Sequence, residues 1–249
     1  SQPQMYQYIK EQYPDLYQKI KAKIIEGRWQ PEGAMWVEAD CTLTSGESLV
    51  RQFLYGKSFL KEEFAYDSQV VWLPDVFGYS AALPQIMQKT NTPYFMTTKL
   101  SWNQYNQIPN DTFVWQGIDG SEVLAHFITT TSEGYSPTPF YTTYNGLLDP
   151  YTIRKSWERY GNKELNDSFL IAYGYGDGGG GPTHEMLETA QRLKDGLPGI
   201  PSIKNSNGVD FFTHLSDELV DKKVERWMGE LYFEYHRGTY TSIAKNKKK

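Results

Sequence analysis

Short apolar runs alternate with helical patterns along most of this 249-residue chain. Residues 70–73, 94–98 and 169–173 have the length and the apolar character of buried strands, and helix-like segments lie between such runs. Strands that are separated by helices favour a parallel sheet with crossover connections, either open or closed into a barrel. The sequence therefore predicts an α/β fold, into which the Asp119-Gly120 turn inserts one hairpin.

Caps and chain breakers set the limits of the other expected elements. Residues 4–26 have the apolar spacing of a helix, with a break at Pro14 and an end at Gly27. An apolar run within residues 29–40 predicts a strand, and Ser45 is the expected N-cap of the helix after it. Further helices are expected at residues 81–89, 151–160 and 183–194, and the hairpin strands at 112–116 and 122–128.

Charge and cysteine content narrow the class of protein. The net charge is −5, so the chain lacks the basic footprint of a nucleic-acid binder. Its one cysteine, Cys41, excludes an intrachain disulfide framework and fits a reducing compartment. No apolar run approaches the length that crosses a bilayer. We therefore expect a cytoplasmic protein with no nucleic-acid or membrane partner. Homo-oligomerisation of the full-length protein is left open.

Two acidic residues stand out because each follows an apolar run and precedes a break in the chain. Asp75 follows Pro74, and Asp177 lies between Gly176 and four further glycines. The carboxyl ends of strands are where α/β folds place their reacting groups, so both aspartates are expected to face one pocket. For Asp75, a role as a cap of the next helix carries equal weight. The glycine run is unlike a phosphate loop, because no Gly-Lys-Ser/Thr follows it.

Paired carboxylates in an aromatic-rich chain favour glycoside hydrolysis. In its retaining form, one carboxylate attacks the anomeric carbon, while the other donates and then accepts a proton. Aromatic residues make up 15% of the chain and suit the faces of sugars, although they also fill ordinary cores. This combination makes a sugar the leading substrate class.

The four histidines differ in their surroundings. His184 is expected at a helix start and His214 in helix packing, while His126 lies near a strand end and either packs in the sheet or faces the pocket. His236 follows an aromatic segment and precedes Arg-Gly-Thr, which makes it the best candidate for a metal ligand. One histidine and one aspartate are too few for a zinc site, which needs three or four ligands.

Four motifs together resemble those of glycoside hydrolase family 38 α-mannosidases, most closely the cytosolic and bacterial branch. They occupy residues 72–87, 99–103, 174–183 and 229–241 in the family's order, and the likeness covers essentially the whole chain. The resemblance implies an irregular seven-stranded (β/α) barrel. It also implies a retaining, metal-dependent enzyme that hydrolyses terminal α-mannosyl linkages of glycans, with α-mannoside oligosaccharides as its partners.

The resemblance also assigns roles to individual residues. Asp75 matches the family's nucleophile, which also binds a zinc ion that holds two hydroxyls of the mannose. Asp177 matches the position of the general acid/base, and His236 matches the region that supplies a zinc-binding histidine. Asp75 and His236 are therefore the expected metal ligands, and Asp75 and Asp177 the expected catalytic pair.

Three residues are candidates for contacts with the substrate. Lys99 falls in the second motif, where a basic residue can approach the nucleophile. Trp36 lies near the end of the expected early strand. Tyr135 lies in a long polar loop at residues 129–149, which is expected to run over the pocket.

One motif of the family is absent from this sequence. Its His-x-Asp pair, which supplies further zinc ligands near the start of the barrel, has no match and would lie upstream of Ser1. The resemblance therefore implies a partial catalytic barrel over residues 1–243 that lacks its first strand. The start of a helical region is expected at 244–249. Poor zinc binding by this segment alone is a further implication.

Two other functions stay open on the residues alone. A metal-dependent carbohydrate deacetylase also combines Asp and His on an α/β barrel, but it needs no second carboxylate as proton donor. It would tolerate a neutral replacement at Asp177. A catalytically inactive sugar-binding module would instead use Trp72, Trp102, Trp115 and the tyrosine-rich loop to bind its ligand.

Overall fold

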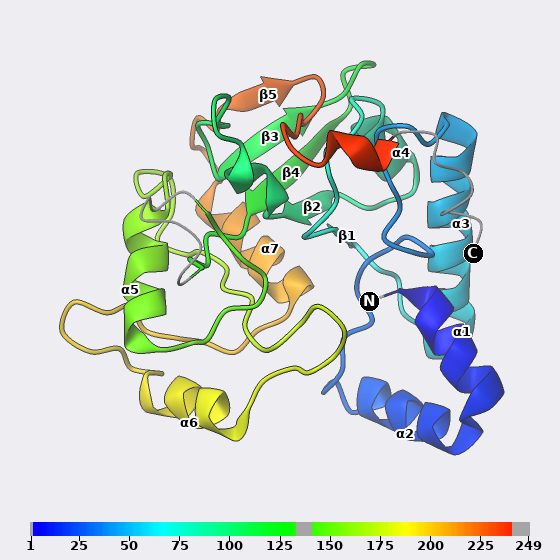
Figure 1. Ribbon diagram of the computed structural model, residues 1–249, viewed down its shortest axis with the longest axis horizontal. Coiled ribbons are helices and arrows are strands. Elements are labelled where there is room, and N and C mark those ends of the chain that lie inside the picture. Colours follow the sequence, from blue (N-terminus) through cyan, green and yellow to red (C-terminus); the bar gives the residue numbers. More distant parts are fainter. Residues whose placement is uncertain (1, 133–140, 241–249) are drawn as a thin grey trace.

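A five-stranded sheet forms the centre of the computed structural model, which describes residues 2–132 and 141–240 (Figure 1). Its strands are β1 (Val70–Trp72), β2 (Tyr94–Thr97), β3 (Thr112–Gln116), β4 (Glu122–Phe127) and β5 (Arg226–Met228). They lie in the order β1-β2-β4-β3-β5. β2 runs parallel to β1 and β4, β3 runs antiparallel to β4, and β5 runs parallel to β3. The predicted α/β class and the inserted hairpin are therefore confirmed.

Helices connect and cover the strands. They are α1 (Pro3–Gln12), α2 (Pro14–Ile25), α3 (Gly46–Phe64), α4 (Leu83–Lys89), α5 (Pro150–Arg159), α6 (His184–Arg192) and α7 (Gly208–Glu218), with the 3₁₀ helices η1 (Lys99–Trp102) and η2 (Arg237–Tyr240). Pro14 opens α2, because a proline is tolerated in the first turn of a helix. Ser45 caps α3 as predicted, since its side chain accepts a hydrogen bond from the Ser48 N–H.

The two faces of the sheet bury different side chains, because successive residues of a strand point in opposite directions. Val71 and Phe95 belong to one apolar core together with side chains of α3 and α4. Val70 and Met96 belong to a second core together with side chains of α7. Both faces are thus covered, as is typical of parallel strands joined by helices.

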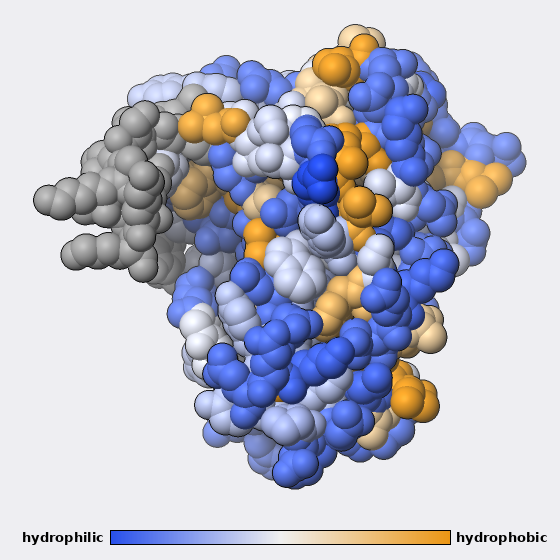
Figure 2. Space-filling view, turned by 90° about the vertical axis from the view of Figure 1, so that its right-hand side faces the viewer, coloured by the Kyte–Doolittle hydropathy of each residue, from blue (hydrophilic) through white to orange (hydrophobic). Residues whose placement is uncertain are grey.

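The three N-terminal helices form a layer on one flank of the molecule (Figure 1). They meet in a small apolar cluster that contains Tyr6 of α1, Tyr17 and Ile20 of α2, and Leu60 of α3. The face that this flank turns to solvent is mostly hydrophilic, with separate hydrophobic patches (Figure 2). This small cluster, distinct from the cores beside the sheet, holds α1 and α2 in place.

The strand predicted within residues 29–40 is wrong. Ala34 has a positive φ of 61°, which bends the backbone out of an extended path. The Trp36 N–H then donates to the Gln52 carbonyl on α3, at 2.9 Å, and not to a neighbouring strand. The segment is therefore an irregular connection that is anchored to a helix.

The strand predicted at residues 169–173 is also wrong. This segment forms a single isolated bridge, between Tyr173 and Gly146. The Ala172 N–H donates to the side chain of Thr130 at 3.2 Å, so no ladder develops. Within the described residues the sheet is open, with β1 and β5 at its edges. The expected seven-stranded barrel is therefore not confirmed.

Residues 1, 133–140 and 241–249 lie outside the described part of the chain. Two predictions fall there, namely the substrate contact of Tyr135 and the helical start at 244–249. In the part that is described, no helix has both the length and the apolar character needed to cross a bilayer.

Candidate active site

Asp75 and Lys99 meet where two parallel strands end. The register pairs Trp72 with Met96, so the segments after β1 and β2 leave the sheet side by side. The Lys99 N–H donates to the Pro74 carbonyl at 3.1 Å. As a result, Lys99 Nζ lies 2.6 Å from Asp75 Oδ1.

Aromatic rings also hold Lys99. Its Nζ lies 5.3 Å from the centre of the Phe77 ring and 4.9 Å from that of Trp102, distances at which a ring face attracts a cation. The Lys99 side chain is only 12% exposed, whereas that of Asp75 is 35% exposed. The carboxylate is therefore open to a ligand, while its cationic partner is mostly buried.

A tight glycine loop presents Asp177. Tyr175 and Gly181 exchange two backbone hydrogen bonds, of 2.9 and 2.6 Å, which close the loop between them. Asp177 itself has a φ of 54°, an uncommon left-handed conformation for a residue with a side chain. A Cβ at Gly176 would lie 2.1 Å from Asn145 Oδ1. The glycine thus allows the loop to approach Asn145 closely.

Tyr144 joins the two aspartates. Its hydroxyl oxygen lies 2.6 Å from Asp177 Oδ1 and 3.1 Å from Asp75 Oδ2. Asn145 donates from Nδ2 to the other Asp177 oxygen at 3.0 Å. Burial, followed by the hydrogen bonds and charges of the two carboxylates, raises the pKa of Tyr144 far above its usual value, so the phenol keeps its proton. The structure thus brings together the two carboxylates that the sequence singled out.

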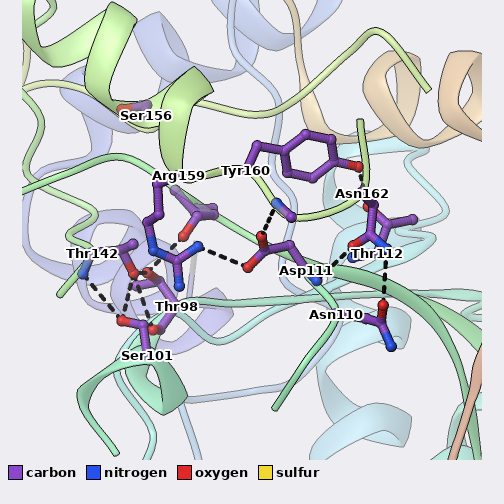
Figure 3. Close-up of polar contacts among 12 residues, drawn as sticks. Thr98, Ser101, Asn110, Asp111, Thr112, Thr142, Ser156, Arg159, Tyr160 and Asn162 are labelled. Carbon is purple, nitrogen blue, oxygen red and sulfur yellow. Dashed lines mark hydrogen bonds and ion pairs between the residues drawn. The ribbon is translucent and has the colours of Figure 1, made fainter. Parts of the chain in front are cut away.

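A buried hydroxyl network holds the segment that carries Tyr144 (Figure 3). Ser101 Oγ and Thr142 Oγ1 lie 2.7 Å apart, and the Thr142 N–H donates to Ser101 Oγ at 3.1 Å. The Thr98 hydroxyl bonds to the same Thr142 hydroxyl. These bonds tie the segment after β2, which carries Lys99, to the segment that carries Tyr144.

These groups line a cavity of about 620 Å³. Its wall includes Asp75, Lys99, Trp102, Tyr144, Tyr175 and Asp177. The volume lies within the range of small-molecule sites. A wall that combines aromatic rings with carboxylates suits a sugar, because rings pack on its faces and polar groups bond to its hydroxyls.

Asp75 also borders a second cavity, of about 340 Å³, which Glu38 and Asp40 help to line. His236, the predicted metal ligand, has its ring centre 4.7 Å from that of Phe77. Within the described ranges, no three His, Cys, Asp or Glu side chains are grouped so that they could hold a metal ion. These residues alone therefore do not fit a complete zinc site, which needs at least three protein ligands.

Trp36 lies away from the candidate site. Its ring meets Phe59 of α3 edge-on, with centres 5.7 Å apart. The described walls of the two cavities beside Asp75 do not include it. A substrate contact by Trp36 stays a prediction, as does one by Tyr135.

His126 takes the first of its two expected positions and packs inside the sheet. It is fully buried, the Leu170 N–H donates to its Nε2 at 3.3 Å, and its Nδ1 lies 2.9 Å from the Thr112 hydroxyl. Burial lowers the pKa of His126 to about 3, so the ring is neutral. His184 is exposed on α6, and His214 is exposed on α7 although helix packing was expected for it.

Sequence reasoning missed Tyr144 and Asn145, which both contact Asp177. They belong to the loop at residues 129–149, which has no periodic pattern from which side-chain direction could be inferred. The one available signal was the expected course of this loop over the pocket. Within the loop, that signal favours no tyrosine over another.

Comparisons with known proteins identify relatives along the whole chain. The profile of the "Glycosyl hydrolases family 38 N-terminal domain" matches residues 1–230. Alpha-mannosidase G of Dictyostelium discoideum is 47% identical over 251 residues, and Alpha-mannosidase 2C1 of Homo sapiens is 40% identical over 248. Each alignment covers 100% of this chain and 22% of the relative, so the chain spans about a fifth of the relatives' length.

A solved structure also shares the fold. An alpha-mannosidase from Enterococcus faecalis V583 superimposes with a TM-score of 0.68 over 89% of this chain and 24% of that protein, at 19% identity. At this identity the likeness concerns the fold alone. The profile match and the similar sequences show that the chain belongs to glycosyl hydrolase family 38, as part of its N-terminal domain.

Proposed function

We propose that this protein is a retaining α-mannosidase that hydrolyses terminal α-mannosyl linkages of glycans. Its family supports glycoside hydrolysis, and the names of its relatives support an α-mannoside substrate. The observation that carries the retaining mechanism is the contact of one hydroxyl, that of Tyr144, with both Asp75 and Asp177.

The spacing of the carboxylates favours a covalent intermediate. Asp75 Oδ2 and Asp177 Oδ1 contact the same Tyr144 oxygen, at 3.1 and 2.6 Å. These two carboxylate oxygens are therefore less than about 6 Å apart. Retaining enzymes place their carboxyl groups about 5–5.5 Å apart, whereas inverting enzymes need about 6.5–9.5 Å to admit a water.

In the proposed mechanism, Asp75 is the nucleophile and Asp177 the acid/base. Lys99 holds one oxygen of Asp75 and so orients the carboxylate. An Asp75 oxygen bonds to the anomeric carbon as the glycosidic C–O bond breaks, and the Asp177 proton passes to the leaving oxygen. Water then attacks the anomeric carbon, gives a proton to Asp177 and displaces the Asp75 carboxylate.

Zinc is part of the proposal as an expectation from the family. Asp75 and His236 would supply two ligands, and their carboxylate oxygen and imidazole nitrogen are ligand types that zinc accepts. Among the described residues, no three His, Cys, Asp or Glu side chains form a group that could hold the ion. None of the steps above therefore depends on the ion.

A cytoplasmic location is also proposed. Cys41, the single cysteine of the sequence, is buried and free. A chain without disulfides suits a reducing compartment. Cell fractionation tests this, and recovery of the protein from a secreted fraction would contradict it.

Proton NMR of aryl α-mannoside hydrolysis by the full-length protein, with and without added zinc, tests the proposed function. We expect α-mannose as the first product before mutarotation, zinc-enhanced turnover, and no turnover by Asp75→Ala. First-formed β-mannose would contradict the retaining mechanism. Release of acetate from an acetylated sugar without mannoside hydrolysis would favour the deacetylase, and sugar binding without either reaction would favour the inactive module.

A further inference from the structure

A third cavity adjoins the one that holds the two aspartates. It has a volume of about 390 Å³, and its walls include Trp72 of β1, Tyr173 and the start of α7. Tyr144, Asn145 and Tyr175 line both this cavity and the cavity of about 620 Å³. The third cavity, here named the Trp72 cavity, therefore shares a wall with the cavity of the two aspartates.

Tyr175 is the most exposed residue of this shared wall. Its surface is 55% exposed. Backbone hydrogen bonds of 2.9 and 2.6 Å with Gly181 hold it, and a Cβ at Gly180 would lie 2.8 Å from Tyr175 Cβ. The glycine therefore lets the loop pack directly on the base of the Tyr175 side chain. An exposed ring on a fixed backbone has little freedom to lose when a ligand packs on it.

The proposed reaction determines on which side the leaving sugar lies. The acid gives its proton to the leaving oxygen, so the leaving sugar begins beside Asp177. One Asp177 oxygen faces the Tyr144 hydroxyl that also contacts the nucleophile, and the other accepts from Asn145 Nδ2 at 3.0 Å. Asn145 borders the Trp72 cavity, and Tyr175 lies two residues before Asp177. The side of Asp177 remote from the nucleophile thus leads to the Trp72 cavity.

We propose that Tyr175 and the Trp72 cavity form a subsite for the leaving sugar, with the ring of that hexose packed on the Tyr175 ring. This inference rests on the proposed function and names the leaving half of its substrate. The C–H face of a hexose packs on aromatic rings, while its hydroxyls need polar partners. Trp72 and Tyr173 offer further ring surface in this cavity, and Ser206 and Asn145 offer polar side chains. The preferred leaving group is therefore a sugar and not a short alcohol.

Exposure alone does not indicate a binding surface, because single exposed aromatic residues are normal on proteins. Tyr105, for example, is 81% exposed and is not among the described wall residues of either cavity. Tyr175 combines exposure with a place between two cavities, one of which holds the proposed catalytic pair. Tyr105 is therefore the matched control for a variant of Tyr175.

The variants Tyr175→Ala, Tyr175→Phe and Tyr105→Ala test the proposal in the full-length protein. Each is assayed with methyl α-mannoside and with an α-linked mannobiose, in whichever linkage isomer the wild type hydrolyses fastest. Both leaving groups are alcohols that need the Asp177 proton, but only mannobiose has a second ring to pack on Tyr175. The comparison therefore separates contact with the leaving sugar from an indirect effect on the acid.

Tyr175→Ala is expected to lose at least about 10-fold more kcat/KM on mannobiose than on methyl α-mannoside, because the ring beneath the leaving sugar is gone. Tyr175→Phe keeps the ring and should restore most of the preference for mannobiose. Tyr105→Ala should stay within about two-fold of the wild type on both substrates. Equal losses of Tyr175→Ala on both substrates, or no loss, would overturn the proposal.

Binding to Asp177→Asn provides a second test that needs no turnover. Calorimetry measures the Kd of mannobiose and of methyl α-mannoside, with and without the additional change Tyr175→Ala. The added change should weaken mannobiose at least about 10-fold more than methyl α-mannoside. An unchanged Kd for mannobiose would overturn the subsite. Wild-type hydrolysis with retention is measured separately, so the proposed function and this inference can fail independently.

Discussion

Both oxygens of Asp75 are engaged before any ligand binds. Lys99 Nζ lies 2.6 Å from Oδ1, and Tyr144 Oη lies 3.1 Å from Oδ2. A carboxylate that is held at two points has less orientational freedom to lose on the way to a transition state. At the scale of single residues, the orientation of the proposed nucleophile is therefore built into the resting protein.

Asp177→Asn should separate substrates by leaving group. Asparagine cannot donate the acid proton, so kcat/KM for phenyl α-mannoside should fall by about 10²–10⁴-fold, and that for dinitrophenyl α-mannoside much less. Steady-state kinetics with both substrates measures this. Asp195→Asn, at an exposed aspartate after α6, serves as the control. Equal losses on the two substrates would count against an acid/base role for Asp177.

His126 should make the protein less stable in acid. Burial lowers its pKa to about 3, below the value of about 6.5 in an unfolded chain. Between these values, the unfolded chain binds a proton that the folded chain does not. The free energy of unfolding therefore falls as the pH falls, by about 1.4 kcal/mol per pH unit from this group.

Urea unfolding of the wild type and of His126→Gln, between about pH 6 and pH 4, measures this dependence. The variant should be less stable at neutral pH but should lose less stability on acidification. His214→Gln, which replaces an exposed histidine of α7, is the matched control variant. Identical slopes for the wild type and His126→Gln would refute the prediction.

Sequence reasoning reached the charged residues of the candidate site but not those that connect them. Asp75 and Asp177 stand out because each carboxylate follows an apolar run, and Lys99 because it falls in a family motif. Tyr144 and Asn145 depend on hydroxyl contacts between segments that are 41 residues apart, such as that of Ser101 with Thr142. Contacts of this kind leave no mark on the local sequence.

At the scale of elements, a buried ion pair joins α5 to the start of β3 (Figure 3). Arg159 lies 2.8 Å from Asp111 Oδ1, with side chains 13% and 9% exposed, and the Gly161 N–H donates to Asp111 Oδ2 at 2.8 Å. Asp111→Asn removes the negative charge that faces the guanidinium and should lower the free energy of unfolding by about 3 kcal/mol.

Urea denaturation measures this loss against that of Glu47→Gln, which breaks the exposed pair of Glu47 with Arg51 on α3. The control substitution should lower the free energy of unfolding by less than about 1 kcal/mol, because ion pairs at the surface contribute little to stability. Comparable losses of unfolding free energy in the two variants would show that the ion pair of Asp111 does not stabilise the attachment of α5.

Gly176→Ala should damage activity more than stability. The new Cβ would lie 2.1 Å from Asn145 Oδ1, so the amide that holds Asp177 must move. A displacement of about 1 Å at a catalytic group costs about 10²-fold in rate, which is the expected loss of kcat/KM. Gly46→Ala, where a Cβ would meet no atom within 4 Å, is the control. Full activity of Gly176→Ala would show that Asn145 does not position Asp177.

The helix cap at Ser45 was predictable from the sequence, while the fate of two expected strands was not. A cap forms between residues that are close in the sequence, whereas a strand forms only if it pairs with a segment that is distant in the sequence. The cap at Ser45 is a contact within a few residues. Whether an extended segment joins a sheet depends on the partners that its N–H groups find. For residues 29–40 and 169–173 these partners include the Gln52 carbonyl and the Thr130 side chain.

At the scale of the whole molecule, the alternation of strands and helices was enough to predict the α/β class. Strands that are joined by a crossover helix run parallel, so the order of strands and helices along the sequence indicates the fold class. The number of strands and the closure of the sheet do not follow from order. The described chain has five strands in an open sheet where seven in a barrel were expected.

The glycine loop at residues 175–181 lies outside the sheet, so we expect activity to be lost before the fold. The loop continues from Gly174, whose N–H donates to Gly146 O at 2.9 Å, with no strand ladder to reinforce it. Segments with few such bonds open at a lower free energy than the core. In urea, the proposed mannosidase activity of the full-length protein should therefore decline at lower concentrations than the far-ultraviolet circular dichroism signal. Coincident transitions would contradict this order.

The sheet ends on its two shortest strands, β1 and β5, each of three residues. Val70 and Val71 of β1 are fully buried, and this edge of the sheet is therefore covered. β5 is more exposed, but its Arg226 lies 2.9 Å from Glu122, and a charge at this position opposes the docking of a foreign strand. Among the described residues, an open sheet with such edges offers little exposed backbone with which a strand of another molecule could pair.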